Sequence, residues 1–149
     1  MIPNKITIHC SATINNQECD ISEIRKWHKA RGFVDVGYHG VIQPSGEFQK
    51  GRGLNIKGAH VKGHNEGNIG ICLIGTDKFT SKQFATLRYH LDAMYMLYPI
   101  EDYGLFTHAQ FDSAIKQGKT CPNIPINNLF AWYFLNDSSA MSDYLIQSN

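Results

Sequence analysis

The sequence predicts a single α/β domain, because segments with strand patterning alternate with segments of helical periodicity along 149 residues. A chain of this length forms one domain of ordinary size and buries a core without metal or disulfide crosslinks. Two strands, at residues 5–10 and 68–75, and two helices, at residues 20–32 and 80–98, carry the prediction. We therefore expect one unit over residues 1–149, without internal repeats or low-complexity linkers.

The first expected element is a strand at residues 5–10. Ile6 and Ile8 alternate there with polar neighbours, which is the pattern of a strand with one buried face. The run ends at His9 and Cys10, before the polar SATINN turn. His9 is therefore expected at the end of a strand.

An amphipathic helix of about three turns should follow this turn. Asp20 and Glu23 have the spacing of a capping box, and Gly32 ends the run. Between them, four residues recur at helical spacing and define the buried face: Ile21, Ile24, Trp27 and His28.

Residues 38–52 are expected to form a hairpin, with its turn at Pro44-Ser45-Gly46. Strand alternation would then place the side chains of Tyr38 and His39 on opposite faces. Residues 51–67 are rich in glycine and carry three lysines or arginines among few large apolar groups, which is typical of a surface loop. Loops of this kind often line functional sites.

The second half of the chain predicts a buried strand, a core helix and a last short strand. The strand is the apolar run at residues 68–75. The helix begins with a capping box at Thr80 and Gln83 and ends before Pro99. Residues 103–107 then form a short strand, and the segment that follows is expected to be a loop.

Three side chains at the ends of expected strands or in loops suit a catalytic zinc site, namely His9, His108 and Cys121. Imidazole nitrogen and thiolate sulfur favour zinc over magnesium or calcium, and three protein ligands leave one coordination position open. A zinc ion held in this way brings the pKa of bound water toward neutrality. Amide hydrolysis also needs an oxyanion stabiliser and a proton donor, for which Lys119 and Tyr38 are candidates. Taken singly, His9 at a strand end is more typical of a structural histidine and Cys121 of a small buried thiol, and only their combination favours a metal site.

Composition excludes several classes of partner. Lysine and arginine number 14 against 13 aspartates and glutamates, so the net charge does not indicate a nucleic-acid partner. No stretch reaches transmembrane length, and the N-terminus lacks the pattern of a secretory signal, so we expect no membrane association and a cytoplasmic location. The four cysteines form no CxxC pair, which favours free or metal-bound thiols.

Several ordered motifs resemble the zinc-dependent N-acetylmuramoyl-L-alanine amidases, a family that includes small amidase-type phage lysozymes and the animal peptidoglycan recognition proteins. The resemblance runs from about residue 5 to about residue 125. It is carried by ITIHCSAT, IRKWHKARGFVDVGYHGVIQPSG, GAHVKGHNEGNIGICLIGT, FTSKQFATLRYHL and KTCP. The resemblance implies a central mixed β-sheet flanked by α-helices.

The resemblance also implies the roles of the candidate site residues. His9, His108 and Cys121 would ligate one Zn²⁺ ion. Tyr38 corresponds to the active-site tyrosine, and Lys119 to the lysine that polarises the scissile carbonyl or holds the oxyanion. The bond cleaved would be the amide between N-acetylmuramic acid and L-alanine. One departure is Ala109-Gln110, where many members have Arg-Asp after the second ligand.

Two further sets of histidines need interpretation. In the family, the loop at residues 51–67 edges the substrate groove, so His60 and Asn65 are expected contacts to glycan or peptide, with a solvent-exposed role as the alternative. His60 and His64 also have the spacing of two ligands on one helical face, although the surrounding glycines argue against a helix. Strand alternation directs His39 away from a metal that Tyr38 faces.

These features predict a phage endolysin that stays in the cytoplasm until its release to the cell wall. The alternatives are a cytosolic muropeptide-recycling amidase and a non-catalytic peptidoglycan-binding or regulatory module; Cys121 disfavours the latter, because recognition-only relatives lack this thiolate. We expect a monomer with peptidoglycan or muropeptide as its partner. Residues 126–149 form a C-terminal extension that should pack on the domain, or else offer its aromatic residues to a regulatory protein partner.

Overall fold

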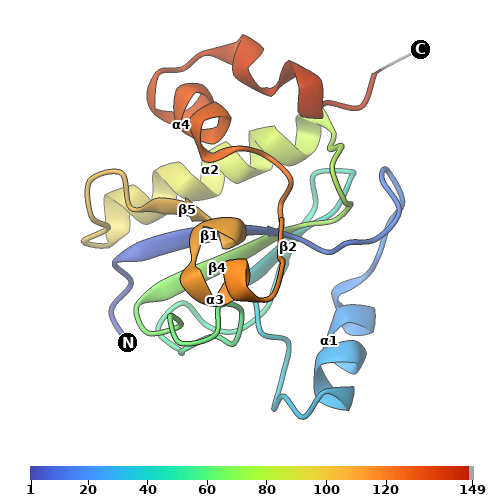
Figure 1. Ribbon diagram of the computed structural model, residues 1–149, viewed down its shortest axis with the longest axis vertical. Coiled ribbons are helices and arrows are strands. Elements are labelled where there is room, and N and C mark those ends of the chain that lie inside the picture. The colour runs from blue at the N-terminus through green and yellow to red at the C-terminus, as the bar shows by residue number, and fades with distance from the viewer. Residues whose placement is uncertain (148–149) are drawn as a thin grey trace.

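The computed structural model describes residues 1–147, and its centre is a five-stranded mixed sheet in the order β3-β2-β4-β1-β5 (Figure 1). The strands are β1 (Lys5–Cys10), β2 (Gly40–Ile42), β3 (Phe48–Lys50), β4 (Asn68–Leu73) and β5 (Leu105–Thr107). β1 runs parallel to both β4 and β5, and β2 runs parallel to β4. Only β3 is antiparallel, to β2, so the expected mixed sheet and the expected hairpin are both confirmed.

Helices cover both faces of this sheet. They are α1 (Ile21–Ala30), α2 (Ser81–Leu97), α3 (Asp112–Lys116) and α4 (Ile126–Phe134), with two 3-10 segments, η1 (His108–Gln110) and η2 (Ser138–Tyr144). Figure 1 shows α2 and α4 stacked on one side of the sheet, with α1 and α3 on the other. α3 lies where a loop was expected, because a helix of five residues is too short to show an apolar period. No helix among residues 1–147 has the length and apolar character needed to cross a membrane.

The two faces of the sheet differ in chemistry. Ile6 and Ile8 of β1, with Ile69 and Ile71 of β4, point to the side of α2 and α4 and are fully buried in the main core. The residues between them point to the opposite side, because side chains alternate along a strand. On that side lie a set of small, polar and sulfur-containing residues: Thr7, His9, Asn68, Gly70 and Cys72.

The capping box predicted for α2 is present. The Thr80 hydroxyl accepts a hydrogen bond from the Gln83 N–H at 3.1 Å, and the Gln83 side chain accepts one from the Thr80 N–H at 2.9 Å. The amide of Gln83 also donates to the carbonyls of Ile42 and Ile74, at 3.1 and 2.9 Å. One buried side chain therefore both starts the helix and fixes it to the ends of β2 and β4.

The start of α1 differs from the expectation. Asp20 does cap the helix, but its carboxylate accepts from the N–H of Ser22 at 2.9 Å. Glu23 forms an ion pair with Lys26 at 3.2 Å instead of completing a capping box, because its side chain is exposed and a cation lies one turn along the helix. Trp27, expected on the buried face, is 46% exposed.

The C-terminal segment contributes to the main core. Leu129 is fully buried, and Trp132 lies 5.7 Å from the ring of Phe84 between ring centroids. The guanidinium of Arg88 lies over the Trp132 ring at 4.5 Å and donates to the Trp132 carbonyl at 2.6 Å. The sheet face under α2 is therefore closed by α4.

We predict that Leu129→Ala lowers the free energy of unfolding by about 2 to 5 kcal/mol, because it removes a fully buried side chain and leaves a cavity between α4 and the sheet. Urea unfolding followed by circular dichroism measures the change. The matched control is Leu135→Ala, since Leu135 is 77% exposed in the same segment and its truncation should cost less than about 0.5 kcal/mol. Equal effects of the two substitutions would contradict the packing of α4 described above.

Candidate metal centre

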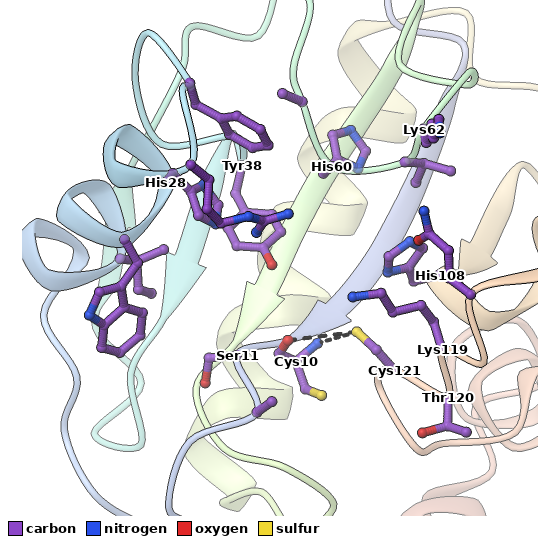
Figure 2. Close-up of a pocket in the computed structure, with 18 of the residues that line it drawn as sticks. Cys10, Ser11, His28, Tyr38, His60, Lys62, His108, Lys119, Thr120 and Cys121 are labelled. Carbon is purple, nitrogen blue, oxygen red and sulfur yellow. Dashed lines mark hydrogen bonds between the residues drawn. The ribbon is translucent and has the colours of Figure 1, made fainter. Parts of the chain in front are cut away.

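Three potential metal ligands come together at the carboxyl ends of β1 and β5. His9 lies in β1, His108 follows β5 directly, and Cys121 lies in the loop after α3. Their ligand atoms all lie within 4.8 Å of one another, and the rings of His9 and His108 are 4.6 Å apart between centroids. Figure 2 shows His108 and Cys121 at this position. Because β1 and β5 are adjacent parallel strands, their ends place the two imidazoles side by side.

Backbone hydrogen bonds hold Cys121 at this position. The N–H of Cys10 donates to the Cys121 sulfur at 2.9 Å, as Figure 2 shows. The N–H of Ala109 donates to the Cys121 carbonyl at 3.0 Å. The chain thus leaves the sheet after His108, turns through α3 and returns to the same strand ends. Ala109 stands where many members of the family that this sequence resembles have arginine. It contributes through its backbone N–H, which helps to hold Cys121 in place.

Burial sets the protonation of the three ligands. It lowers the pKa of His9 well below its ordinary value, and, together with Lys119, it lowers the pKa of His108 to about 4. Both imidazoles are therefore neutral at pH 7 and have a free lone pair. The neighbouring Cys10 thiol and burial raise the pKa of Cys121, so its sulfur keeps a proton until a cation displaces it.

This donor set fits a zinc ion. Two neutral nitrogens and one sulfur are typical of zinc, whereas magnesium and calcium take oxygen donors. His108 and Cys121 line an open pocket, so a fourth coordination position would face a ligand in that pocket. Such an arrangement is typical of catalytic and not of structural zinc sites.

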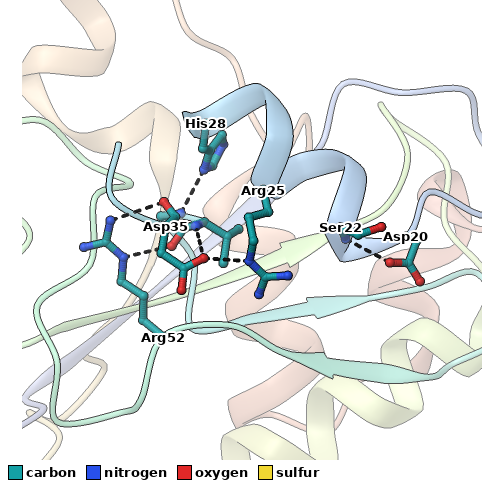
Figure 3. Close-up of polar contacts among 8 residues, drawn as sticks. Asp20, Ser22, Arg25, His28, Asp35 and Arg52 are labelled. Atoms are coloured by element: carbon teal, nitrogen blue, oxygen red, sulfur yellow. Dashed lines mark hydrogen bonds and ion pairs between the residues drawn. The ribbon is translucent and has the colours of Figure 1, made fainter. Parts of the chain in front are cut away.

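Tyr38 lies beside the cluster, with its ring centroid 5.0 Å from that of His9. Burial raises the pKa of Tyr38, so the phenol stays protonated and can donate a hydrogen bond. The segment that carries it is fixed by polar contacts that Figure 3 shows. Arg25 pairs with the Asp35 carboxylate at 2.7 Å, and Arg52 donates to the Val36 carbonyl at 2.8 Å.

The pocket in front of these residues has a volume of about 720 Å³ and a cationic lining. Arg31, Lys62 and Lys119 contribute positive charge, and no aspartate or glutamate lines it among residues 1–147. Trp27 and Phe33 add aromatic surface at the same wall. The pocket therefore suits a ligand that carries carboxylates together with a surface on which aromatic rings can pack. Sequence reasoning identified only Lys119 among these five, because the other four come from two segments that approach each other only in the fold.

His60 and Asn65 both line this pocket, but the protein uses most of their polar atoms. His60 is 8% exposed, and its ring nitrogens lie 2.8 Å from His9 Nε2 and 2.8 Å from the Asn68 carbonyl. The Asn65 side-chain oxygen accepts from the N–H groups of His60 and Val61, at 2.8 and 2.9 Å. For Asn65 the amide NH₂ is the group that can still donate to a ligand.

One expectation about the other histidines is corrected. The strand alternation expected at Tyr38 and His39 does not apply, because β2 begins only at Gly40. The ring of His39 lies 5.8 Å from that of His60, and its nitrogens are bound to the Gly70 N–H and the Ile56 carbonyl. The ring of His64 contacts the Asp112 carboxylate at 2.9 Å, and the glycines around it form no helix, as expected.

We predict that the metal-free protein loses stability as the pH falls below about 6.5. The pKa of His60 is about 3 and that of His108 about 4, whereas both rings titrate near 6.5 when unfolded, so the unfolded chain binds more protons between these values. For the buried His60 ring, the free energy of unfolding should fall by about 1 kcal/mol for each pH unit. The fall should be smaller for His108, because its ring is partly exposed to solvent. Urea unfolding with a chelator present, at about pH 7.5 and about pH 5.5, measures the change; equal stability at both would contradict the burial of neutral imidazoles.

Comparison with known proteins places this site in a family. The model of the family described as N-acetylmuramoyl-L-alanine amidase matches residues 1–124. The endolysin of Enterobacteria phage T3 is 36% identical over 140 residues, which cover 89% of this chain and 86% of the relative. The endolysin of Klebsiella phage KP32 is 34% identical over 142 residues, covering 90% and 87%.

Solved structures agree with this assignment. The N-acetylmuramoyl-L-alanine amidase LysC from Clostridium intestinale URNW superposes with a TM-score of 0.76 at 28% identity, covering 90% of this chain and 85% of that one. Peptidoglycan recognition protein-LE, solved in complex with tracheal cytotoxin, shares the fold with a TM-score of 0.74 at 24% identity, covering 89% and 82%. Because the family model and the phage relatives match most of its length, the chain belongs to the N-acetylmuramoyl-L-alanine amidase family.

Proposed function

We propose that this amidase works with one Zn²⁺ ion held by His9, His108 and Cys121, and that it degrades the bacterial cell wall as a phage endolysin. The observation that carries the proposal is the convergence of two neutral imidazoles and one thiol within 4.8 Å, where His108 and Cys121 line a cationic pocket. The zinc, when bound, would supply Lewis acidity toward the scissile carbonyl and toward water.

The chain's own residues supply the rest of the chemistry for cleavage of the amide between N-acetylmuramic acid and L-alanine. The ammonium of Lys119 lines the pocket beside His108 and would stabilise the oxyanion that develops on the carbonyl oxygen. The phenol of Tyr38 stays protonated and would hold the reacting groups by donating a hydrogen bond.

The pocket supports peptidoglycan or a muropeptide as the substrate. Stem peptides carry free carboxylates, which the positive charges of Arg31 and Lys62 would attract. Sugar rings pack well on aromatic side chains, and Trp27 offers such a surface at the wall of the pocket. The Asn65 amide and the carbon edge of the His60 ring remain the expected contacts of the loop at residues 51–67.

The phage relatives favour the endolysin over a muropeptide-recycling enzyme. The relatives from phages T3, T7 and KP32 are all described as endolysins, and each alignment covers more than four fifths of both chains. We therefore propose that the protein is made in the cytoplasm of an infected cell and acts on the polymeric wall after release, as a monomer. A comparison of rates on intact wall and on soluble muropeptides distinguishes the two roles, since a recycling enzyme would prefer the soluble substrate.

We predict that Lys119→Ala lowers turnover by about 10²-fold or more while zinc content stays at one ion per chain, because an oxyanion donor is lost and no ligand is changed. Release of stem peptides from purified peptidoglycan measures turnover, and mass spectrometry under native conditions measures zinc. The matched control is Lys116→Ala, an exposed lysine of α3 that does not line the pocket. Wild-type turnover in Lys119→Ala would exclude the assigned role.

We predict that Cys121→Ser abolishes both zinc binding and release of stem peptides with a free L-alanine amine, because a serine hydroxyl is a poor zinc ligand at neutral pH. Cys19→Ser is the control, since Cys19 is a free cysteine outside the pocket lining. Chelation of the wild type should have the same effect as the substitution, and added zinc should reverse it. Amidase activity that survives both treatments would contradict zinc dependence, and zinc binding without any cleavage would favour a wall-binding module.

A further inference from the structure

We propose that His60 is a positioning residue that fixes which nitrogen of His9 carries the proton and thereby presents His9 Nδ1 to the metal. The observation is a chain of two hydrogen bonds that runs from a backbone carbonyl through both rings. The proposal rests on the zinc site proposed above, but its first test needs no metal. It assigns His60 a role other than substrate contact.

The Asn68 carbonyl sets the direction of both hydrogen bonds. His60 Nε2 lies 2.8 Å from the Asn68 carbonyl oxygen, which can only accept, so Nε2 carries the proton. Both rings are buried, at 1% and 8% exposure, and a neutral imidazole has a single N–H. His60 Nδ1 is therefore an acceptor. It lies 2.8 Å from His9 Nε2, which must donate, and the lone pair of His9 is left on Nδ1.

The carbonyl that sets this direction is itself immobilised. The Asn68 side chain accepts from the Thr7 hydroxyl at 2.8 Å and donates to the His64 carbonyl at 2.8 Å. Asn68 is fully buried, and it is paired in register with Lys5 of β1. The carbonyl that accepts from His60 therefore belongs to the first residue of the central strand β4.

The ring of His60 also fits a space that the backbone leaves open for it. A Cβ atom on Gly70 would lie 2.6 Å from Cγ of His60, and one on Gly58 would lie 2.8 Å from its Cδ2. The backbone N–H of His60 is held by Asn65 at 2.8 Å. The ring is thus confined between two glycines, with one nitrogen directed at the sheet and the other at His9.

This arrangement bears directly on metal binding. Histidine ligands of zinc commonly donate their second N–H to an acceptor that fixes the tautomer and the ring orientation, and loss of that acceptor costs about 10- to 100-fold in metal affinity. At His9 the acceptor is the His60 imidazole, whose own proton is held on Nε2 by the Asn68 carbonyl.

The first test is nitrogen-15 NMR of the imidazole rings in the metal-free wild-type chain. We expect Nε2–H tautomers for both His9 and His60. A proton on Nδ1 of His9, or equal populations of its two tautomers, would overturn the proposal. This measurement is independent of the proposed function, because it would succeed even if the protein bound no zinc.

The second test compares two amide substitutions at the same position. In His60→Asn the side-chain oxygen takes the place of Nδ1 and can still accept from His9, whereas in His60→Gln the amide takes the place of Nε2 and keeps only the contact with Asn68. We expect zinc affinity, measured by competition with a chromophoric chelator, to fall about 10- to 100-fold in His60→Gln and to stay within a few-fold of wild type in His60→Asn. Equal losses in both variants would indicate a packing role only, and no loss in either would also exclude the positioning role.

Discussion

The parallel pairing of β1 with β4 and β5 is the constraint on which the rest of the structure depends. It brings the carboxyl ends of β1 and β5 together, so His9 and His108 meet although 98 residues lie between them in the sequence. The same pairing buries β1 in the centre of the sheet, where alternate residues must face two different environments. One face becomes the apolar core under α2 and α4, and the other becomes the wall of the site.

Burial on the second face imposes a strict requirement on polar groups. A buried imidazole without a partner would destabilise the fold, and each of the three buried histidines near the cluster has a defined one. His39 bonds to Gly70 and Ile56, His28 accepts from Gly37, and His60 joins His9 to the Asn68 carbonyl. The result is a set of imidazole rings with fixed orientation around His9.

The charge of the pocket contrasts with that of the whole molecule. The chain has a formal net charge of +1, yet the described pocket lining holds Arg31, Lys62 and Lys119 and no carboxylate. Positive charge is thus concentrated where a substrate with carboxylates would bind, and Lys119 lies next to the ligands as well. Burial, together with the positive charge of Lys119, also keeps the His108 imidazole neutral by lowering its pKa.

The strands and long helices could be predicted from local patterns, since Ile6 and Ile8 alternate and the Thr80–Gln83 capping box is local. The three proposed metal ligands were identified through motifs that resemble a known family. The fold was needed for features that depend on contacts between distant segments: His39 lies beside His60, and Arg31 and Lys62 line one pocket. Local periodicity reports which face a residue takes within one element. The partner of a buried polar group is fixed only when the sheet assembles, so the place of His60 between His9 and Asn68 could not be derived from the order of residues alone.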